Sequence, residues 1–305
     1  MACYSPIQAY RNPYDHSGPL LFSPPHSNFS LKRNIALSGL KIPCGQCIGC
    51  RLEYSRQWAM RCHHEASLHI FNSFITLTYD PEHLPEDGSL NVVHFQKFMK
   101  RLRKKIQPLK IRFFHCGEYG DKTRRPHYHA LIFGYGFPDK KIFKKQKSGD
   151  LFTSDILTKC WGMGHCLLGD LTFESAAYVA RYVVKKINGQ QKFLHYAVIN
   201  HETGEFHSLK QEYTTMSRRP GIAADWFAKY YEDVYPSDSI YVNGRVMRPP
   251  KYYDILFKKL DPALMEQISD TRRDNFNPTD CTPERLKVRE ICAQAKLAQC
   301  SRDVV

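Results

Sequence analysis

Hydrophobic and polar positions along the chain follow two periods, one typical of helices and one typical of strands. The expected helices span residues 52–69, 93–106, 154–160, 173–187, 221–231, 252–260 and 283–298, and the expected strands span residues 72–79, 111–118 and 127–134. A short polar segment joins the last two strands, so we expect them to form a β-hairpin.

This order of elements predicts an α+β fold with a central, mainly antiparallel β-sheet flanked by helices. Residues 1–43 are rich in Pro, Ser and Asn and are expected to be largely irregular. We therefore expect three segments: residues 1–70 with an N-terminal arm, a cysteine-rich stretch and a helix; residues 71–235 with the core domain; and residues 236–305 as a helical C-terminal extension.

The charge of the chain favours a polyanionic partner. Lys and Arg number 44 against 30 Asp and Glu, which gives a net charge of +14. Each Lys or Arg that meets a phosphate releases a condensed counterion, so such an excess favours nucleic acid. The excess is concentrated at residues 97–110 and 140–145. A solvated basic face is the alternative interpretation, and charge does not decide between the two.

The chain lacks an apolar run near 18 residues and lacks a basic start followed by an apolar stretch, so we expect no membrane association, no secretory signal and a cytosolic location. It has 11 cysteines, an odd number, which argues against a disulfide framework in such a chain.

Two histidines in the third expected strand are candidate metal ligands. His127 and His129 flank Tyr128, and alternate residues of a strand point to the same face. The pattern is weak by itself, since roughly 0.6 such pairs are expected by chance from this composition. Glu118 ends the neighbouring strand, and a hairpin can bring it beside the histidines. Two imidazoles and a carboxylate can hold a divalent cation with positions left open. The alternative is a pair of surface histidines.

The helix at residues 173–187 carries two tyrosines at a spacing of one turn. Apolar residues form a stripe at helical period along it, at positions 176, 179, 180, 183, 184 and 187. Tyr178, Tyr182 and Lys185 fall opposite this stripe, so we expect the tyrosines to lie outside the core face. Tyrosines at this spacing can reach one reaction centre. An interaction surface is the alternative.

The chemistry of these residues suits nucleophilic attack. A tyrosine has an ordinary pKa near 10, which a nearby cation lowers. Lys185 follows Tyr182 by three residues, and Arg181 stands in the same relation to Tyr178. A phosphotyrosine ester keeps the energy of a cleaved phosphodiester, so that religation needs no nucleotide cofactor.

Three cysteines near the N-terminus have the spacing of zinc ligands. They are Cys44, Cys47 and Cys50, and a structural zinc site needs a fourth ligand. Cys62 is excluded if one helix runs on from Cys50, because twelve residues then separate the two by roughly 18 Å. We expect Cys3 in the irregular arm to complete a possible structural zinc site. The alternative is three reduced cysteines in a tight turn.

Three segments of the chain resemble the motifs of a known family. Residues 74–79, 126–132 and 178–185 resemble, in order, the three rolling-circle motifs of the HUH endonucleases, which are named for two metal-binding histidines around a hydrophobic residue. The chain is most similar to the replication-initiation proteins of microviruses, especially the gokushovirus branch, over roughly residues 40–260. Residues 43–51 and 216–221 look typical of that branch. The last 45 residues or so add little.

The resemblance implies an HUH endonuclease-like core that nicks and rejoins origin DNA through a 5′-phosphotyrosine and so starts rolling-circle replication of a small circular single-stranded phage genome. It implies Mg²⁺ or Mn²⁺ held by Glu118, His127 and His129, and catalysis by Tyr178 and Tyr182 with Lys185. The implied partners are viral origin DNA and the helicase, polymerase and single-strand binding protein of the host, in the host cytoplasm. Candidate DNA contacts are Arg124, Arg125, Arg181 and Lys186.

Three alternatives stay open. A plasmid-type initiator or a transposase of the HUH class is the nearest rival. A non-catalytic basic DNA-binding protein is the second alternative, and the position of the tyrosines speaks against it. A metal hydrolase that uses activated water is the third, and it would leave no DNA attached to the protein.

Overall fold

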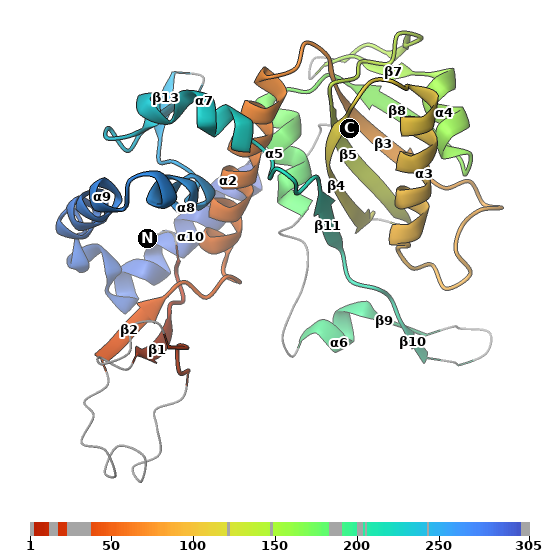
Figure 1. Cartoon of the computed structure of the whole chain (residues 1–305). Helices are drawn as coiled ribbons and strands as arrows, with labels where there is room; N and C mark the ends of the chain where they lie inside the picture. Colours follow the sequence, from red (N-terminus) through yellow and green to blue (C-terminus); the bar gives the residue numbers. More distant parts are fainter. Residues whose placement is uncertain are drawn as a thin grey trace. The chain divides into compact units, whose positions relative to one another are not determined.

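The computed structural model describes residues 3–11, 18–22, 38–120, 123–146, 149–182, 191–199, 204, 206–242 and 244–299 of the chain (Figure 1). The chain divides into two compact units. The first consists of Met1–Glu53 and Phe276–Arg302, and the second contains Tyr54–Asn275. Helix α2 (Ile48–Ser67) begins in the first unit and ends in the second.

The first unit contains a small two-stranded sheet. Strand β1 (Ile7–Arg11) pairs antiparallel with β2 (Ser38–Ile42), and Ile7 lies opposite Ile42. The 3₁₀ helix η1 (Pro278–Cys281) and helix α10 (Pro283–Gln299) belong to the same unit. The expectation that residues 1–43 are largely irregular is therefore wrong for these strands. Their pairing joins segments far apart in the sequence, which local periodicity does not reveal.

A seven-stranded sheet organises the second unit, and each pair of neighbouring strands is antiparallel. The strands, in order across the sheet, are β11 (Tyr213–Met216), β4 (Arg112–Tyr119), β5 (Pro126–Phe133), β3 (Asn72–Thr78), β8 (Cys166–Gly169), β7 (Leu151–Thr153) and β6 (Lys141–Lys144). The three central strands β4, β5 and β3 are buried on both faces, which explains their nearly continuous apolar sequences.

One face of the sheet is covered by α3 (Val92–Lys105) and α4 (Asp155–Trp161) (Figure 1). The side chains of Ile75 and Tyr128 point to this face and pack in one cluster with Phe98 and Trp161. Each fully buried aromatic side chain of this kind stabilises the fold by roughly 2–3 kcal/mol. Both helices start at a side-chain cap, as Asn91 accepts from the Val93 amide and Ser154 from the Leu157 amide.

The other face of the sheet packs against α2 and α5, the latter described over Phe173–Tyr182. Trp58 of α2 lies against Phe114 of β4, with ring centroids 4.8 Å apart. The same cluster takes in side chains of three further helices. They are α7 (Ala224–Val234), α8 (Lys251–Leu260) and α9 (Pro262–Asp274). The central sheet therefore has helices on both faces, and the predicted α+β class is confirmed.

Short elements complete the second unit. Helix α6 (Gln191–Tyr196) precedes the strand pair β9 (Ala197–Ile199) and β10 (Phe206–Ser208), and β12 (Ile240–Val242) pairs with β13 (Arg245–Met247). Strands of three or four residues carry too few positions for a period to show, so sequence analysis missed them, and it also missed α9. None of the helices in the described residues is long and apolar enough to cross a membrane.

Candidate metal and tyrosine site

The β4–β5 hairpin brings the three expected metal ligands together. Its register places Glu118 directly opposite His127, and Cys116 opposite His129. Because side chains alternate along a strand, Glu118, His127 and His129 all point to the sheet face that carries α5. The cross-strand relationship expected from the sequence is therefore present.

The donor atoms of these residues lie close enough to share one ion. Nε2 of His127 lies 2.6 Å from Oε1 of Glu118, and Nε2 of His129 lies 3.1 Å from the same oxygen. The ligand atoms all lie within 4.8 Å of one another. The two imidazole rings are nearly perpendicular, at 89°, so that their Nε2 atoms converge from different directions.

Hydrogen bonds behind the rings fix which nitrogen faces the site. The Nδ1–H of His127 donates to the carbonyl oxygen of Arg125 at 3.1 Å, so the neutral ring keeps its lone pair on Nε2. Nδ1 of His129 shares a hydrogen bond of 2.9 Å with the hydroxyl of Thr76. Partners of this kind orient metal-binding histidines and hold the correct tautomer.

Burial makes the site depend on charge. Glu118 and His129 have side chains only 2% exposed, whereas His127 is 18% exposed. Burial by itself would raise the pKa of Glu118, but the hydrogen bonds and positive charge of the two histidines outweigh it and lower the pKa to about 2. The carboxylate is therefore ionised at neutral pH and is ready to bind a cation.

The donor set fits a divalent cation of intermediate hardness. A carboxylate oxygen suits Mg²⁺ and Mn²⁺, and two imidazoles are compatible with Mn²⁺. Three protein ligands leave coordination positions for a substrate oxygen. The residues present thus fit the metal that sequence analysis predicts, and the structure identifies the site without identifying the ion.

Helix α5 places Tyr178 beside this site. The helix begins with a reciprocal cap, in which the Thr172 amide donates to Ser175 Oγ at 2.8 Å and the Ser175 amide donates to Thr172 Oγ1 at 3.1 Å. The ring of Tyr178 lies edge-on to the ring of His129, with centroids 5.5 Å apart, and 6.1 Å from that of Phe74. A tyrosine and a candidate metal ligand are thereby in direct ring contact.

The environment of Tyr178 differs from the expected one. The predicted apolar stripe is buried at Ala176, Val179 and Ala180. Tyr178 itself is half-buried and packs against the same core cluster, so it does not occupy a face separate from the core. The helix has the sheet on one side, and on another the hydroxyl of Ser55 in α2 donates to the Ala177 carbonyl at 3.4 Å. A helical wheel treats one face as core and does not anticipate both contacts.

Several predicted site residues lie outside what the structure describes. The backbone of Arg181 and Tyr182 ends α5, but their side chains are not among the described ones. Lys185 and Lys186 lie wholly outside the described residues. The roles expected for these four residues stay predictions.

The guanidinium groups of Arg124 and Arg125 bind backbone carbonyl groups of the chain itself. Arg124 Nη2 donates to the His195 carbonyl at 2.7 Å, and Arg125 Nη2 donates to the Tyr79 carbonyl at 2.9 Å. Arg124 is exposed, and Arg125 also orients His127 through its own carbonyl. Their predicted contact with DNA stays a prediction.

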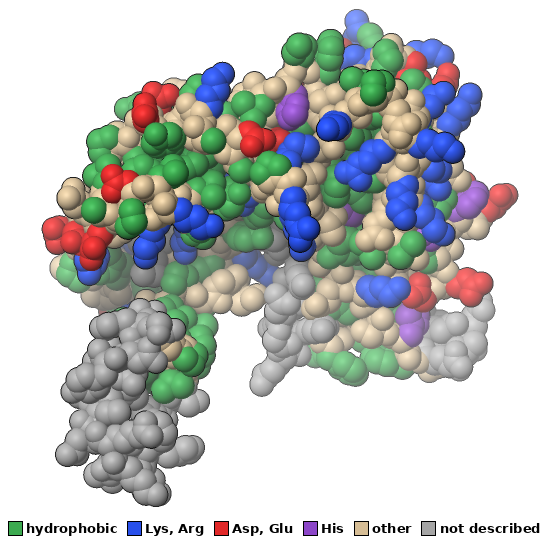
Figure 2. Space-filling view, viewed as in Figure 1, with side chains coloured by type: hydrophobic (Ala, Val, Ile, Leu, Met, Phe, Trp, Pro, Cys, Tyr) green, Lys and Arg blue, Asp and Glu red, His purple; other side chains and the backbone are tan. Residues whose placement is uncertain are grey.

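The most basic helix lies on the other face of the sheet. Figure 2 shows Lys and Arg side chains gathered over α3, whose apolar residues pack with the cluster opposite α5. The exposed basic residues of α3 are Lys97, Lys100, Arg101, Arg103, Lys104 and Lys105. Because the sheet separates α3 from the metal ligands, this basic face does not line the site.

The structure also brings the four expected cysteines together, with the sulfur atoms of Cys3, Cys44, Cys47 and Cys50 within 4.8 Å of one another. The α2 helix is continuous past Cys62, whose side chain is fully buried in the core of the second unit. Cys62 is not part of the cluster, as the rise of a helix predicts.

Sequence analysis missed two residues that support the site. Thr76 binds Nδ1 of His129, and the ring of Phe74 stacks on that of His129 with centroids 5.6 Å apart. Both lie on β3, whose register places Thr76 opposite His129. The period-two pattern of this strand already put Phe74 and Thr76 on one face, but it did not reveal which neighbour they face.

Comparison with known proteins identifies the family. A family model described as replication-associated protein ORF2 matches residues 72–187, which include the metal ligands and the tyrosine helix. The chain is 33% identical over 273 residues to Replication-associated protein VP4 of Bdellovibrio phage phiMH2K, covering 86% of this chain and 79% of that protein.

A second relative, Replication-associated protein ORF2 of Spiroplasma virus 4, is 32% identical over 296 residues, covering 89% of this chain and 86% of that protein. A third, Replication-associated protein ORF4 of Chlamydia phage 1, is 31% identical, and the match covers 72% of this chain and 54% of that protein. No solved structure gives a significant match. As its resemblance to the microvirus initiators predicted, the chain belongs to the family of phage replication-associated proteins.

Proposed function

We propose that this protein is a metal-dependent tyrosine endonuclease and strand transferase that nicks and rejoins single-stranded DNA at a phage replication origin. The contact between the rings of Tyr178 and His129 carries the proposal, because it puts a phenol next to the candidate metal site. The relatives are phage replication-associated proteins, and the conversion of a circular genome into new circles requires a strand to be opened and closed.

The strand-transfer step conserves the number of phosphate ester bonds. The phenolic oxygen of Tyr178 or Tyr182 loses its proton and attacks the scissile phosphorus, the bond from phosphorus to the 3′ oxygen breaks, and that oxygen leaves with a proton. The DNA 5′ end is then attached to the tyrosine as a phosphodiester. In the reverse reaction a 3′ hydroxyl attacks this ester and releases the tyrosine, so no nucleotide is hydrolysed.

Each residue of the site has a distinct task. Glu118, His127 and His129 bind the cation, which when present polarises the scissile phosphate and offsets its developing negative charge. Phe74 and His129 hold the ring of Tyr178 in place. Lys185 favours ionisation of the neighbouring Tyr182 and stabilises the charge of the transition state. The second tyrosine permits a second cleavage while the first still holds a DNA end.

The reaction starts rolling-circle replication in the cytoplasm of the host. The first nick supplies a 3′ hydroxyl that primes the host polymerase, while a host helicase and single-strand binding protein open and protect the template. Arg124, Arg125, Arg181 and Lys186 are the basic residues proposed to contact the origin. The net charge of +14 supports a nucleic-acid partner.

A covalent-adduct assay tests the proposal and separates it from its rivals. The purified chain is incubated with Mn²⁺ and single-stranded DNA of random sequence carrying a 3′ fluorophore, and is then run on a denaturing gel. A tyrosine transferase transfers the labelled strand to the protein. A metal hydrolase using water shortens the DNA without labelling the protein, and a non-catalytic DNA-binding protein leaves the DNA intact.

Variants assign the chemistry to the tyrosines. The double variant Tyr178→Phe/Tyr182→Phe is expected to lose the labelled protein band, whereas Tyr241→Phe, which changes an exposed tyrosine of β12, retains it. An adduct formed by the double variant would disprove the tyrosine assignment.

A further inference from the structure

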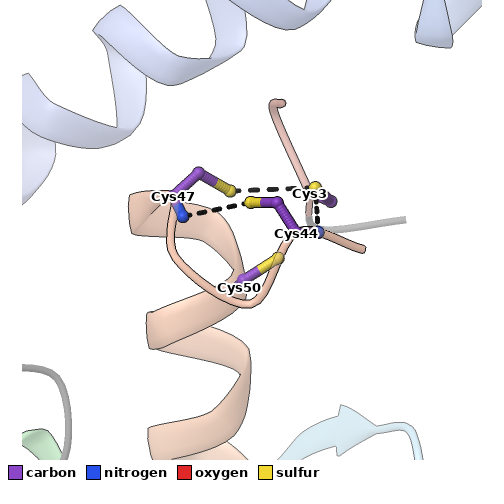
Figure 3. Close-up of side chains that lie close together, drawn as sticks. All are labelled: Cys3, Cys44, Cys47 and Cys50. Atoms are coloured by element: carbon purple, nitrogen blue, oxygen red, sulfur yellow. Dashed lines mark hydrogen bonds between the residues drawn. The ribbon is translucent and has the colours of Figure 1, made fainter. Parts of the chain in front are cut away.

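The four clustered cysteines of the first unit form a second candidate metal site, separate in sequence and composition from the histidine site. Cys3 precedes β1, Cys44 and Cys47 lie in the turn between β2 and α2, and Cys50 lies in the first turn of α2. Figure 3 shows their side chains turned toward one another, and the sulfur atoms lie within 4.8 Å of one another. Residues more than 40 positions apart in the sequence therefore meet at one point.

The spacing of the sulfur atoms suits a shared metal ion. Sγ of Cys47 lies 3.9 Å from Sγ of Cys3. A disulfide would need about 2.05 Å, and no disulfide joins cysteines in the part of the chain that the structure describes. Four thiolates at about 2.3 Å from a tetrahedral zinc ion lie about 3.8 Å from one another. The observed separation is close to the edge of such a tetrahedron.

Backbone amides around the cluster point at the sulfur atoms. The Cys47 amide donates to Cys44 Sγ at 3.2 Å, the Tyr4 amide to Cys47 Sγ at 3.2 Å, and the Cys44 amide to Cys3 Sγ at 3.3 Å. Hydrogen bonds from N–H groups stabilise thiolates, which are the form that binds metal. Gly45, with φ of +73°, provides the left-handed turn that brings these amides inward.

The small apolar core of the first unit gives a reason for such a site. Among the described residues of this unit, the buried hydrophobic side chains are Cys3, Ala9 and Leu286. A two-stranded sheet with five residues in each strand is marginally stable by itself in water. Units with so little buried apolar surface commonly depend on a metal ion or on disulfides.

We propose that Cys3, Cys44, Cys47 and Cys50 bind one zinc ion that ties the N-terminal arm to the start of α2. Four sulfur ligands fill the tetrahedral coordination of zinc, so the ion has a structural role with no position for substrate. Soft thiolates select zinc over the harder Mg²⁺ and Mn²⁺ expected at the histidine site. The amino end of α2, which has no acidic residue in its first turn, favours the negative charge of the tetrathiolate centre.

Metal analysis of the full-length protein tests the proposal. Protein purified under reducing conditions and freed of loosely bound metal is expected to contain about one zinc per chain. Cys3→Ser is expected to lose most of this zinc, and Cys292→Ser, which changes an exposed cysteine of α10 in the same unit, is expected to keep it. His129→Ala is also expected to keep it, which separates the cysteine site from the histidine site.

Replacement with cobalt provides a second measurement that needs no DNA. Co²⁺ bound by four cysteines gives intense sulfur-to-metal charge-transfer absorption, which Cys3→Ser weakens and Cys292→Ser leaves unchanged. Because Cys3 lies in the arm before β1, its substitution leaves the sequence of α2 unchanged, and Cys44→Ser serves as the second variant. Iron in place of zinc, no metal, or zinc lost from His129→Ala but retained in Cys3→Ser would each overturn the proposal. Failure of the DNA adduct assay would leave the zinc result standing.

Discussion

The ring of Tyr178 lies edge-on against the ring of His129, with centroids 5.5 Å apart and an angle of 84° between the ring planes. The two residues come from elements far apart in the sequence, and the contact places a phenol beside a candidate metal ligand. The covalent chemistry proposed for the protein depends on this contact.

We expect Tyr178 to be the residue that carries the DNA when a single cleavage is trapped. Tyr178→Phe should lower the yield of labelled adduct by at least about 100-fold, because the nucleophile is lost while the ring remains. Its unfolding free energy should stay within about 1 kcal/mol of the original protein, since the packing against Phe74 and His129 is retained. Mass spectrometry of the digested adduct locates the linkage. A linkage found exclusively on Tyr182 would contradict this prediction.

The hydroxyl of Thr76 is expected to tune metal affinity without binding the metal. Thr76→Val removes the 2.9 Å hydrogen bond to Nδ1 of His129, so the ring loses the partner that orients it. Mn²⁺ affinity, measured by titration with electron paramagnetic resonance, should fall by about 10- to 100-fold.

A matched control for this variant is available on a neighbouring strand pair. Thr215 makes the same kind of bond, also 2.9 Å, to Nδ1 of His115, a buried histidine that packs on the face opposite the site. Thr215→Val should leave Mn²⁺ affinity unchanged. Equal losses in both variants would show that the effect is a general loosening of the sheet.

The sequence determines the hairpin ligands but not their surroundings. Alternation along a strand was enough to group His127 with His129 and to place Glu118 beside them, since the hairpin register follows from a short connection. The half-buried position of Tyr178 and the support from Thr76 depend on which elements pack against β5. Such tertiary neighbours are not encoded in any local period.

The same distinction applies to the N-terminal segment. The spacing of Cys44, Cys47 and Cys50 suggested a metal site, and the exclusion of Cys62 followed from helix geometry. The pairing of β1 with β2 was missed because short strands separated by a long connection leave little pattern in the sequence. The domain boundaries proposed from sequence stay a prediction.

Acid is expected to destabilise the fold through His64. This ring stacks on Trp226 at 3.6 Å and bonds the Tyr253 hydroxyl at 2.8 Å, and burial, followed by the charge of His63, lowers its pKa to about 3. Below pH 6.5 the unfolded chain binds a proton that the folded chain does not bind. Stability therefore falls as the pH drops from 6.5 toward 3, by about 1.4 kcal/mol per pH unit.

Urea unfolding at pH 7.5 and pH 5.0 measures this loss. For His64 we expect a contribution on the order of 2 kcal/mol between the two pH values. His64→Gln removes the ionisable group and should reduce the difference between the two measurements, whatever its effect at pH 7.5. His83→Gln, which changes an exposed histidine, should retain the full difference. An unchanged difference in His64→Gln would assign the acid sensitivity to other groups.

Gly164 is expected to be required for the contact between the α4–β8 turn and the end of β3. Its φ is +137°, and an added Cβ would lie 2.5 Å from the carbonyl oxygen of Thr78 and still closer to the amide nitrogen of Asp80. Both neighbours are backbone atoms that cannot rotate away. Gly164→Ala should therefore lower the unfolding free energy by about 3 kcal/mol or more.

Gly149 separates the steric effect from backbone strain. Its φ of +124° also disfavours a side chain, but an added Cβ meets nothing within 4 Å. Gly149→Ala should lose only the cost of strain, on the order of 1 kcal/mol. Thermal and urea unfolding of the two variants measures the difference, and similar losses in both would contradict the steric argument. A larger loss in Gly164→Ala would show that close packing of this turn against β3 supports the strand that carries Thr76.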